Sequence, residues 1–149
     1  MKGEPILILL VEDDLAHAEI VQRNLASSRI ANRLIHVTDG QAALDYMNRE
    51  NGYSDPATSP RPGLILLDLR LPKVDGMEVL KRLKSDLKFS SIPVVILTTS
   101  HSEQDIVKAY ALHANSYLVK PADFTQFKEL MKTFGFYWVL WNQSPQDPK

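Results

Sequence analysis

Five short apolar runs, separated by longer amphipathic stretches, organise the sequence. The central run covers residues 64–67, where four apolar residues follow one another without alternation. Such a run is typical of a strand that is buried on both faces of a parallel sheet. The other runs cover residues 6–11, 34–37, 92–97 and 116–119, and the run at 34–37 is the weakest. We therefore predict five strands.

Each predicted strand is followed by a stretch in which apolar residues recur at steps of three and four, as in helices with one buried face. The helices that we predict begin after Asp14, at about 42, at Asp75, at about 102 and near Asp123. Asp14 and Asp75 are placed to cap their helices, and Thr38 has capping-box spacing to Gln41 before the second. Either Ser100 or Ser102 caps the fourth helix. The apolar stripe of the third helix extends to Leu87.

Five strands that alternate with five helices predict one α/β domain over residues 1–149. The right-handed crossover rule favours a doubly wound five-stranded parallel sheet of flavodoxin-like topology. Residues 48–62 are polar and rich in turn-forming residues, so we predict a long inserted surface loop there. In this topology the carboxyl ends of all five strands lie along one edge of the sheet.

The composition excludes several classes of function. The hydrophobic content of 44% and the charged content of 23% are those of a globular domain. A net charge of -1 gives no basic surface for nucleic acid, and no apolar segment is long enough for a membrane span. The chain has no cysteine, which removes disulfides and thiolate metal sites and agrees with a cytoplasmic location. The four histidines form no metal-binding motif, so we assign them ordinary roles.

Candidate chemistry lies at the predicted strand ends. Glu12 and Asp13 follow the first strand and Asp68 follows the third, while Thr98 and Lys120 lie at the ends of the fourth and fifth. Carboxylates brought together repel one another unless a cation lies among them, and Mg²⁺ prefers oxygen ligands. A carboxylate can attack a phosphoryl group, whose charge a lysine and a hydroxyl then stabilise. We predict that Asp68 is the nucleophile, although alone it could merely cap a turn.

These residues resemble the receiver domains of two-component response regulators, the CheY-like family. The resemblance covers almost the whole chain and rests on the acid pair at 12–13, the motif at 68–76, Thr98, Tyr117 and the Lys120-Pro121 dipeptide. It implies a phosphorelay protein rather than a classical enzyme. It also implies that the Lys120-Pro121 peptide bond is cis.

The resemblance implies a role for each matching residue. Asp68 would accept a phosphoryl group from a histidine kinase. The protein would catalyse only its own phosphorylation and dephosphorylation. Asp13, Asp68 and the backbone carbonyl of Arg70 would bind Mg²⁺ directly, and Glu12 would act through water. Thr98 and Lys120 would stabilise the phosphoryl group. Thr98 and Tyr117 would form a switch pair, and Arg70 and Ser100 are placed to gate the attack of water on the aspartyl phosphate.

The long loop and an aromatic C-terminal segment look like the small single-domain receivers that serve cyanobacterial and bacterial phytochrome kinases. We expect no output domain after residue 142, and we therefore expect the receiver to signal by itself. We expect a homodimer that uses the helix extension at about 134–142, where Phe136, Tyr137 and Leu140 lie off the inner apolar stripe.

Two alternatives stay open. One is a receiver-like interaction module that works without phosphorylation. The other is a phosphatase of the haloacid dehalogenase type, which also uses an aspartate nucleophile and Mg²⁺. That family places a second aspartate two residues after the nucleophile, where this chain has Arg70. A nucleotide-binding protein is excluded, because the chain has no glycine-rich phosphate loop.

Overall fold

A single parallel sheet forms the centre of the protein. The computed structural model describes residues 6–26 and 32–135. Its strands are β1 (Ile6–Val11), β2 (Asn32–Val37), β3 (Leu64–Leu67), β4 (Val94–Thr98) and β5 (Ser116–Val119). They lie in the order β2-β1-β3-β4-β5, and all neighbours are parallel. This is the flavodoxin-like order, so the predicted fold class is confirmed.

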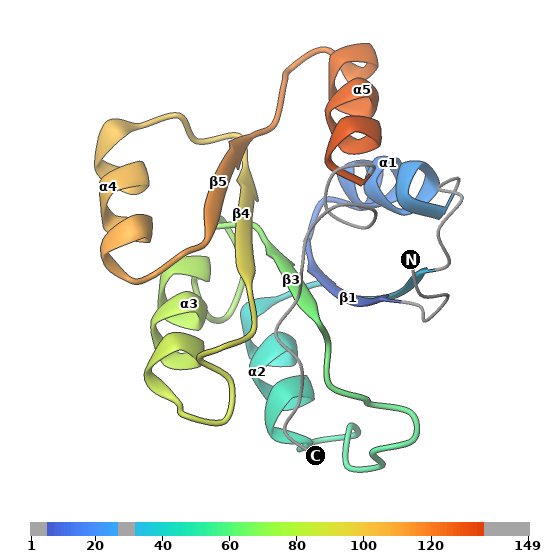
Figure 1. Ribbon diagram of the computed structural model, residues 1–149, viewed down its shortest axis with the longest axis vertical. Helices are drawn as coiled ribbons and strands as arrows, with labels where there is room; N and C mark the ends of the chain where they lie inside the picture. The colour runs from blue at the N-terminus through green and yellow to red at the C-terminus, as the bar shows by residue number, and fades with distance from the viewer. Residues whose placement is uncertain (1–5, 27–31, 136–149) are drawn as a thin grey trace.

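Five helices cover the two faces of the sheet (Figure 1). They are α1 (Leu15–Ala26), α2 (Gly40–Asn48), α3 (Gly76–Ser85), α4 (Glu103–Ala111) and α5 (Phe124–Gly135). Helices α1 and α5 lie side by side on one face, and α2, α3 and α4 lie on the other. No helix within the described ranges has the length and apolar character needed to cross a membrane.

Alternation along the three central strands divides the core into two clusters. Successive side chains of a strand point to opposite faces of the sheet, so every residue of a buried run lies in one cluster or the other. The cluster under α2, α3 and α4 contains Leu9, Val11, Ile65, Leu67, Val94 and Ile96. The cluster under α1 and α5 contains Ile8, Leu10, Leu64, Leu66, Val95 and Leu97. Burial on both faces explains why these strands read as continuous apolar runs.

The first two helices begin at aspartate caps. Asp14 Oδ1 accepts hydrogen bonds from the backbone N–H groups of Ala16 and His17, at 2.9 and 3.1 Å, which confirms the predicted cap of α1. The capping box predicted at Thr38 was wrong. Asp39 caps α2 instead, and its side chain accepts a hydrogen bond of 2.7 Å from the third residue of the helix. Since α2 begins one residue after Asp39, Thr38 lies too early to cap it.

The remaining helix ends differ in how far they follow the sequence pattern. Asp75 precedes α3 but makes no side-chain capping hydrogen bond. Leu87 is 94% exposed, because α3 ends two residues earlier, so the predicted extension of its apolar stripe was wrong. The Ser102 side chain caps α4 by accepting from the N–H of Asp105 at 3.1 Å. The Asp123 side chain accepts from two backbone N–H groups at the start of α5.

The connection between α2 and β3, residues 49–63, contains no helix or strand. Its second half is attached to the body of the domain. The hydroxyl of Tyr46 donates a hydrogen bond of 2.6 Å to the carbonyl oxygen of Pro60. The Arg61 guanidinium lies over the buried ring of Phe89, 4.8 Å from its centroid. The residues predicted to form a dimer interface, Phe136, Tyr137 and Leu140, lie outside the described residues.

Candidate functional site

The backbone of the sheet places the candidate residues at its carboxyl edge. Hydrogen bonds between neighbouring strands continue one residue beyond the strands themselves. The N–H of Asp68 donates to the carbonyl of Val11 at 3.1 Å, and the N–H of Lys120 donates to that of Thr98 at 2.7 Å. The N–H of Glu12 likewise donates to the last residue of β2, at 3.0 Å. The side chains that follow β1, β3 and β5 therefore start from fixed positions along one edge.

Three carboxylates meet at this edge. Glu12, Asp13 and Asp68 each offer an oxygen, and these oxygens lie within 4.8 Å of one another. Glu12 and Asp68 are buried, with 1% and 7% of their surface exposed, whereas Asp13 is exposed. The exposed member leaves the cluster open to solvent on one side. A set of hard oxygen donors with one open side fits Mg²⁺, which keeps several waters when it binds protein.

A buried lysine compensates part of this negative charge. Lys120 Nζ lies 2.6 Å from Glu12 Oε1 and 2.7 Å from Asp68 Oδ2. The Lys120 and Glu12 side chains are each 1% exposed. The structure thus brings the predicted phosphoryl-stabilising lysine onto the predicted nucleophile. It also shows that one ammonium serves two buried carboxylates.

Burial disfavours the charged form of Glu12. Desolvation, and next the negative charge of Asp68, raise the pKa of Glu12 from 4.5 to about 7. The hydrogen bond and the positive charge of Lys120 oppose this shift but do not cancel it. A bound cation among the carboxylates would favour the charged form of Glu12. The site is therefore arranged to gain from a divalent ion.

The predicted switch residues are linked through Ser100. Thr98, at the end of β4, is fully buried, and its Oγ1 accepts a long hydrogen bond of 3.4 Å from the Ser100 N–H. Tyr117 is half-buried on β5, and its hydroxyl donates a hydrogen bond of 3.0 Å to the Ser100 carbonyl oxygen. The segment after β4 is thus connected to both side chains.

A residue of α4 joins this network that sequence reasoning did not select. Asp105 Oδ2 accepts a hydrogen bond of 2.6 Å from the Ser100 hydroxyl. The same oxygen lies 3.1 Å from Nη2 of Arg70, which follows the candidate nucleophile by two residues. Asp105 therefore connects the loop after β3 to the loop after β4. Its sequence signal was its spacing from Ser102, which indicated only a helix cap.

His17 is the second residue that sequence reasoning missed. Its Nδ1 lies 3.0 Å from Lys120 Nζ, although the two residues are 103 positions apart. No motif marks such a contact, because it depends on how α1 packs beside the end of β5. The ordinary role predicted for this histidine does not account for its position.

The Lys120-Pro121 peptide bond is trans, and no cis peptide bond occurs within residues 6–26 and 32–135. The expectation of a cis bond was therefore wrong. Both isomers are accessible to an X-Pro bond, because the trans form is favoured by only about 0.5–1 kcal/mol.

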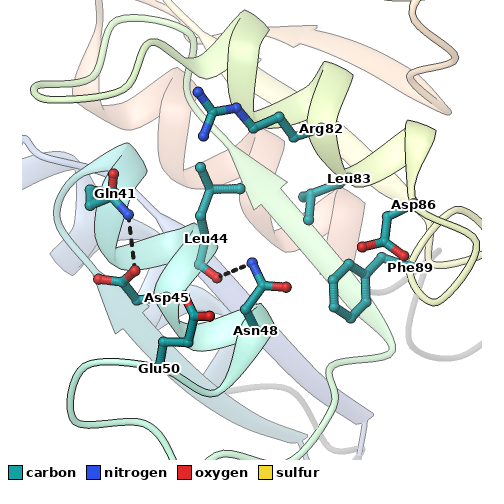
Figure 2. Close-up of a pocket in the computed structure, with 9 residues that line it drawn as sticks. All are labelled: Gln41, Leu44, Asp45, Asn48, Glu50, Arg82, Leu83, Asp86 and Phe89. Atoms are coloured by element: carbon teal, nitrogen blue, oxygen red, sulfur yellow. Dashed lines mark hydrogen bonds between the residues drawn. The ribbon is translucent and has the colours of Figure 1, made fainter.

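A separate cavity of about 280 Å³ lies between α2 and α3 (Figure 2). Leu44, Leu83 and Phe89 give it apolar walls. Asp45 points along α2 toward Gln41, whose amide donates a hydrogen bond of 2.9 Å to Asp45 Oδ1. None of the residues that line this cavity belongs to the acidic cluster.

Comparison with known proteins identifies the family. The model of the response regulator receiver domain matches residues 8–132. This chain is a response regulator receiver domain. The receiver is 44% identical over 142 residues to the probable methanogenesis regulatory protein FilR2 of Methanothrix harundinacea, covering 95% of this chain and 89% of FilR2. It is 43% identical over 135 residues to the response regulator Rcp1 of Synechocystis, covering 91% of this chain and 90% of Rcp1.

Solved structures of two relatives share the fold of this receiver. The Mn²⁺-bound form of Rcp1 superposes with a TM-score of 0.91 at 42% identity, covering 95% of this chain and 100% of the Rcp1 chain. The phosphorylated cyanobacterial phytochrome response regulator RcpA superposes with a TM-score of 0.90 at 40% identity, covering 96% of this chain and 100% of RcpA. The resemblance read from the sequence is thereby confirmed at the level of the family and the fold.

Proposed function

We propose that this receiver accepts a phosphoryl group on Asp68 from a sensor histidine kinase. One observation carries the proposal. The Asp68 carboxylate lies within 4.8 Å of the acidic pair at the end of β1 and 2.7 Å from the Lys120 ammonium at the end of β5. A nucleophile, a cation-binding set and a fixed positive charge thus converge at one edge of the sheet. These are the groups that phosphoryl transfer requires.

In the proposed reaction a carboxylate oxygen of Asp68 forms a bond to phosphorus. The phosphorus–nitrogen bond of the donor phosphohistidine breaks, and the imidazole nitrogen keeps that electron pair. Lys120 Nζ, 2.7 Å from Asp68 Oδ2, is placed to stabilise negative charge on a phosphoryl oxygen. The hydroxyl of Thr98 is the second protein donor that we assign to the phosphoryl group.

The donor set supports Mg²⁺ as the cofactor. We assign Asp13, Asp68 and the Arg70 backbone carbonyl as direct ligands, and Glu12 as a residue that acts through water. Hard carboxylate oxygens within 4.8 Å of one another suit this ion. When bound, Mg²⁺ supplies positive charge that offsets the charge of the phosphoryl oxygens. The Mn²⁺-bound structure of Rcp1 supports the assignment by similarity.

The test is intact mass after incubation with acetyl phosphate. The wild type should gain one phosphoryl group in the presence of Mg²⁺ and none in its absence. The Asp68→Asn variant should gain none under either condition. A folded wild type that gains no mass at any time point and consumes no donor would favour the alternative, a module that works without phosphorylation. Turnover of the donor beyond one equivalent, with no lasting adduct, would favour the phosphatase.

We further propose that the kinase partner is of the phytochrome type. The similarity to RcpA, a phytochrome response regulator, over 96% of this chain supports this assignment. Transfer from candidate kinases can be followed as loss of label from the kinase histidine. A phytochrome kinase should transfer faster than an unrelated kinase of equal autophosphorylation. Equal rates with both kinases would remove the basis for a phytochrome partner.

The aromatic C-terminal segment is proposed to join two copies of the receiver, with Phe136, Tyr137 and Leu140 as interface candidates. Its apolar character on more than one side supports this proposal. Sedimentation of the full chain at micromolar concentration should give a dimer mass, with and without phosphorylation. A monomer mass under both conditions would exclude the homodimer.

A further inference from the structure

His17 completes the surroundings of the Lys120 ammonium. Its Nδ1 lies 3.0 Å from Lys120 Nζ. The other two contacts of Nζ are Glu12 Oε1 at 2.6 Å and Asp68 Oδ2 at 2.7 Å. An ammonium group has three N–H donors and no acceptor. These three contacts therefore account for every hydrogen bond that the ammonium can donate.

The direction of the hydrogen bond follows from the chemistry of the two groups. Because Lys120 can only donate, His17 Nδ1 must accept, and the ring proton lies on Nε2. Burial, and next the charge of Lys120, lower the pKa of His17, which keeps its ring neutral at neutral pH. Asp14 Oδ2 opposes this from 3.6 Å, beyond hydrogen-bond distance. The charges of Asp68 and Asp13 also oppose the lowering of this pKa, to a smaller extent than that of Asp14.

His17 is held through both its backbone N–H and its ring. Asp14 caps the first turn of α1 and accepts a hydrogen bond of 3.1 Å from the His17 N–H. The ring packs edge-on against Phe127 of α5, with centroids 5.5 Å apart and planes at 66°. Phe127 is fully buried in the core beneath α1 and α5. The position of Nδ1 is thus fixed by helix packing rather than by the acidic cluster.

We propose that His17 is a positioning residue for Lys120: it accepts the third hydrogen bond of the ammonium and holds Nζ within reach of a phosphoryl group on Asp68. This inference rests on the proposed function. Of the three partners of Nζ, Glu12 and Asp68 belong to the carboxylate set assigned to the metal, whereas His17 does not. When Glu12 and Asp68 bind a cation, or Asp68 carries a phosphoryl group, their hydrogen bonds with Lys120 Nζ are replaced, but the contact between Nζ and His17 remains. Lys120 then keeps one fixed anchor throughout the cycle.

The first test concerns the wild type alone and needs no phosphorylation. Long-range ¹H–¹⁵N spectra of the ring nitrogens report which nitrogen of His17 carries the proton. We expect a neutral ring with the proton on Nε2, and an Nδ1 resonance that shifts in Lys120→Met. A proton on Nδ1 in the wild type would overturn the proposal, because Nδ1 would then be unable to accept. An Nδ1 resonance that ignores Lys120→Met in the folded variant would overturn it as well.

The second test compares two substitutions at the same position. Leucine fills the space against Phe127 but cannot accept a hydrogen bond, whereas the amide oxygen of asparagine can take the place of Nδ1. With acetyl phosphate and Mg²⁺ both saturating, phosphorylation should slow about tenfold in His17→Leu and stay within about twofold of wild type in His17→Asn. The control is His113→Asn. His113 is exposed after α4, and its φ of 74° is one that asparagine tolerates.

The outcomes separate the two claims. A wild type that takes no phosphoryl group defeats the proposed function and this inference together. If the wild type and His17→Leu are phosphorylated at the same rate, only the role proposed for His17 is overturned. Equal slowing of His17→Leu and His17→Asn also overturns it, since the histidine would then serve packing rather than the hydrogen bond. Slowing of His17→Leu with recovery in His17→Asn supports it.

Discussion

Lys120 Nζ lies 2.6 Å from Glu12 Oε1, and both side chains are 1% exposed. The same ammonium lies 2.7 Å from Asp68 Oδ2, so one buried cation serves two buried carboxylates. Leaving a buried charge without a partner costs about 3–5 kcal/mol. When Glu12, Asp13 and Asp68 are all ionised and no divalent ion is bound, the single positive charge of Lys120 does not balance their negative charge. The stability of the protein should report this imbalance.

The free energy of unfolding in EDTA should fall as pH rises from about 4.5 to about 7. Burial, and next the charge of Asp68, raise the pKa of Glu12 in the folded state, so the folded protein keeps a proton that the unfolded chain has released. Stability from this proton is complete below the unfolded pKa and is lost as pH passes the folded one. The loss amounts to about 3 kcal/mol. Urea denaturation across this range measures it.

Glu12→Gln provides the control for this pH dependence. The variant cannot ionise at position 12, so its stability should lack the fall. His17, whose pKa is lowered, contributes with the opposite sign as pH rises toward 6.5, and both proteins share that contribution. The difference between the two profiles therefore isolates Glu12. Parallel profiles would show that Glu12 titrates normally in the folded state.

Gly76→Ala should destabilise the protein by about 1–3 kcal/mol, the usual cost of overpacking. A Cβ at this position would lie 2.2 Å from the carbonyl oxygen of Asp68 and 2.6 Å from Leu69 Cα. Both atoms belong to backbone, which cannot rotate away. The variant should also move the loop that carries the nucleophile, so phosphorylation should slow. Urea denaturation and intact mass measure the two effects.

Gly52→Asn is the control substitution for Gly76→Ala. Gly52 has a φ of 100° but no heavy atom within 4 Å of an added Cβ, so it tests conformational strain without crowding. Asparagine tolerates positive φ better than most residues, and the cost should stay at about 1 kcal/mol or less. If Gly76→Ala costs no more than Gly52→Asn, close contact with the Asp68 backbone does not constrain the loop.

The sequence was sufficient to predict the residues fixed by the backbone of the sheet. Asp68 follows the buried strand β3, Lys120 follows the partly exposed edge strand β5, and the carboxyl ends of parallel strands meet at one edge. Their meeting thus depends only on the topology. The same reasoning predicted Glu12 and Thr98 at this edge. It needed no knowledge of how any helix packs.

Contacts made by helices could not be predicted in this way. His17 reaches Lys120 because of the rotation and position of α1, and Asp105 reaches Arg70 because of those of α4. Periodicity shows which face of a helix is buried but not which polar residue of its first turn meets another loop. The error at Thr38 was smaller. There a neighbouring side chain offered the better cap.

Arg70→Ala should shorten the lifetime of the phosphorylated receiver about threefold, which corresponds to about 0.6 kcal/mol in the barrier to hydrolysis. The Arg70 side chain is 71% exposed and is held across the loops by Asp105 Oδ2 at 3.1 Å. Its removal opens a path for water beside the nucleophile. The measurement is the decay of the phosphorylated mass after the donor is removed.

Two variants define the origin of this effect. Asp105→Asn weakens the ion pair but keeps the arginine, so it should shorten the lifetime less than Arg70→Ala. Arg82→Ala removes an arginine that pairs with Glu78 on the surface of α3, and it should leave the lifetime unchanged. Equal lifetimes for the wild type and Arg70→Ala would show that this arginine does not gate hydrolysis.

The last prediction concerns the switch proposed for Thr98 and Tyr117. Phosphorylation should draw the Thr98 hydroxyl toward the phosphoryl group and weaken the hydrogen bond of 3.0 Å between Tyr117 and the Ser100 carbonyl. The ring resonances of Tyr117 should therefore shift on phosphorylation in the wild type. Thr98→Val keeps the shape of the side chain without its hydroxyl, and most of the ring shift should be lost. Phosphorylation of this variant is confirmed by intact mass.

Thr99→Val is the matched control, because Thr99 is exposed beside the buried Thr98. Its ring shift should equal that of the wild type. Tyr117→Phe removes only the donated hydrogen bond and should change the free energy of unfolding by about 1 kcal/mol or less. A Tyr117 shift that survives in phosphorylated Thr98→Val would mean that the ring responds to phosphorylation by another route. A shift lost only in Thr98→Val would make the buried hydroxyl the link between the phosphoryl group and the surface of β5.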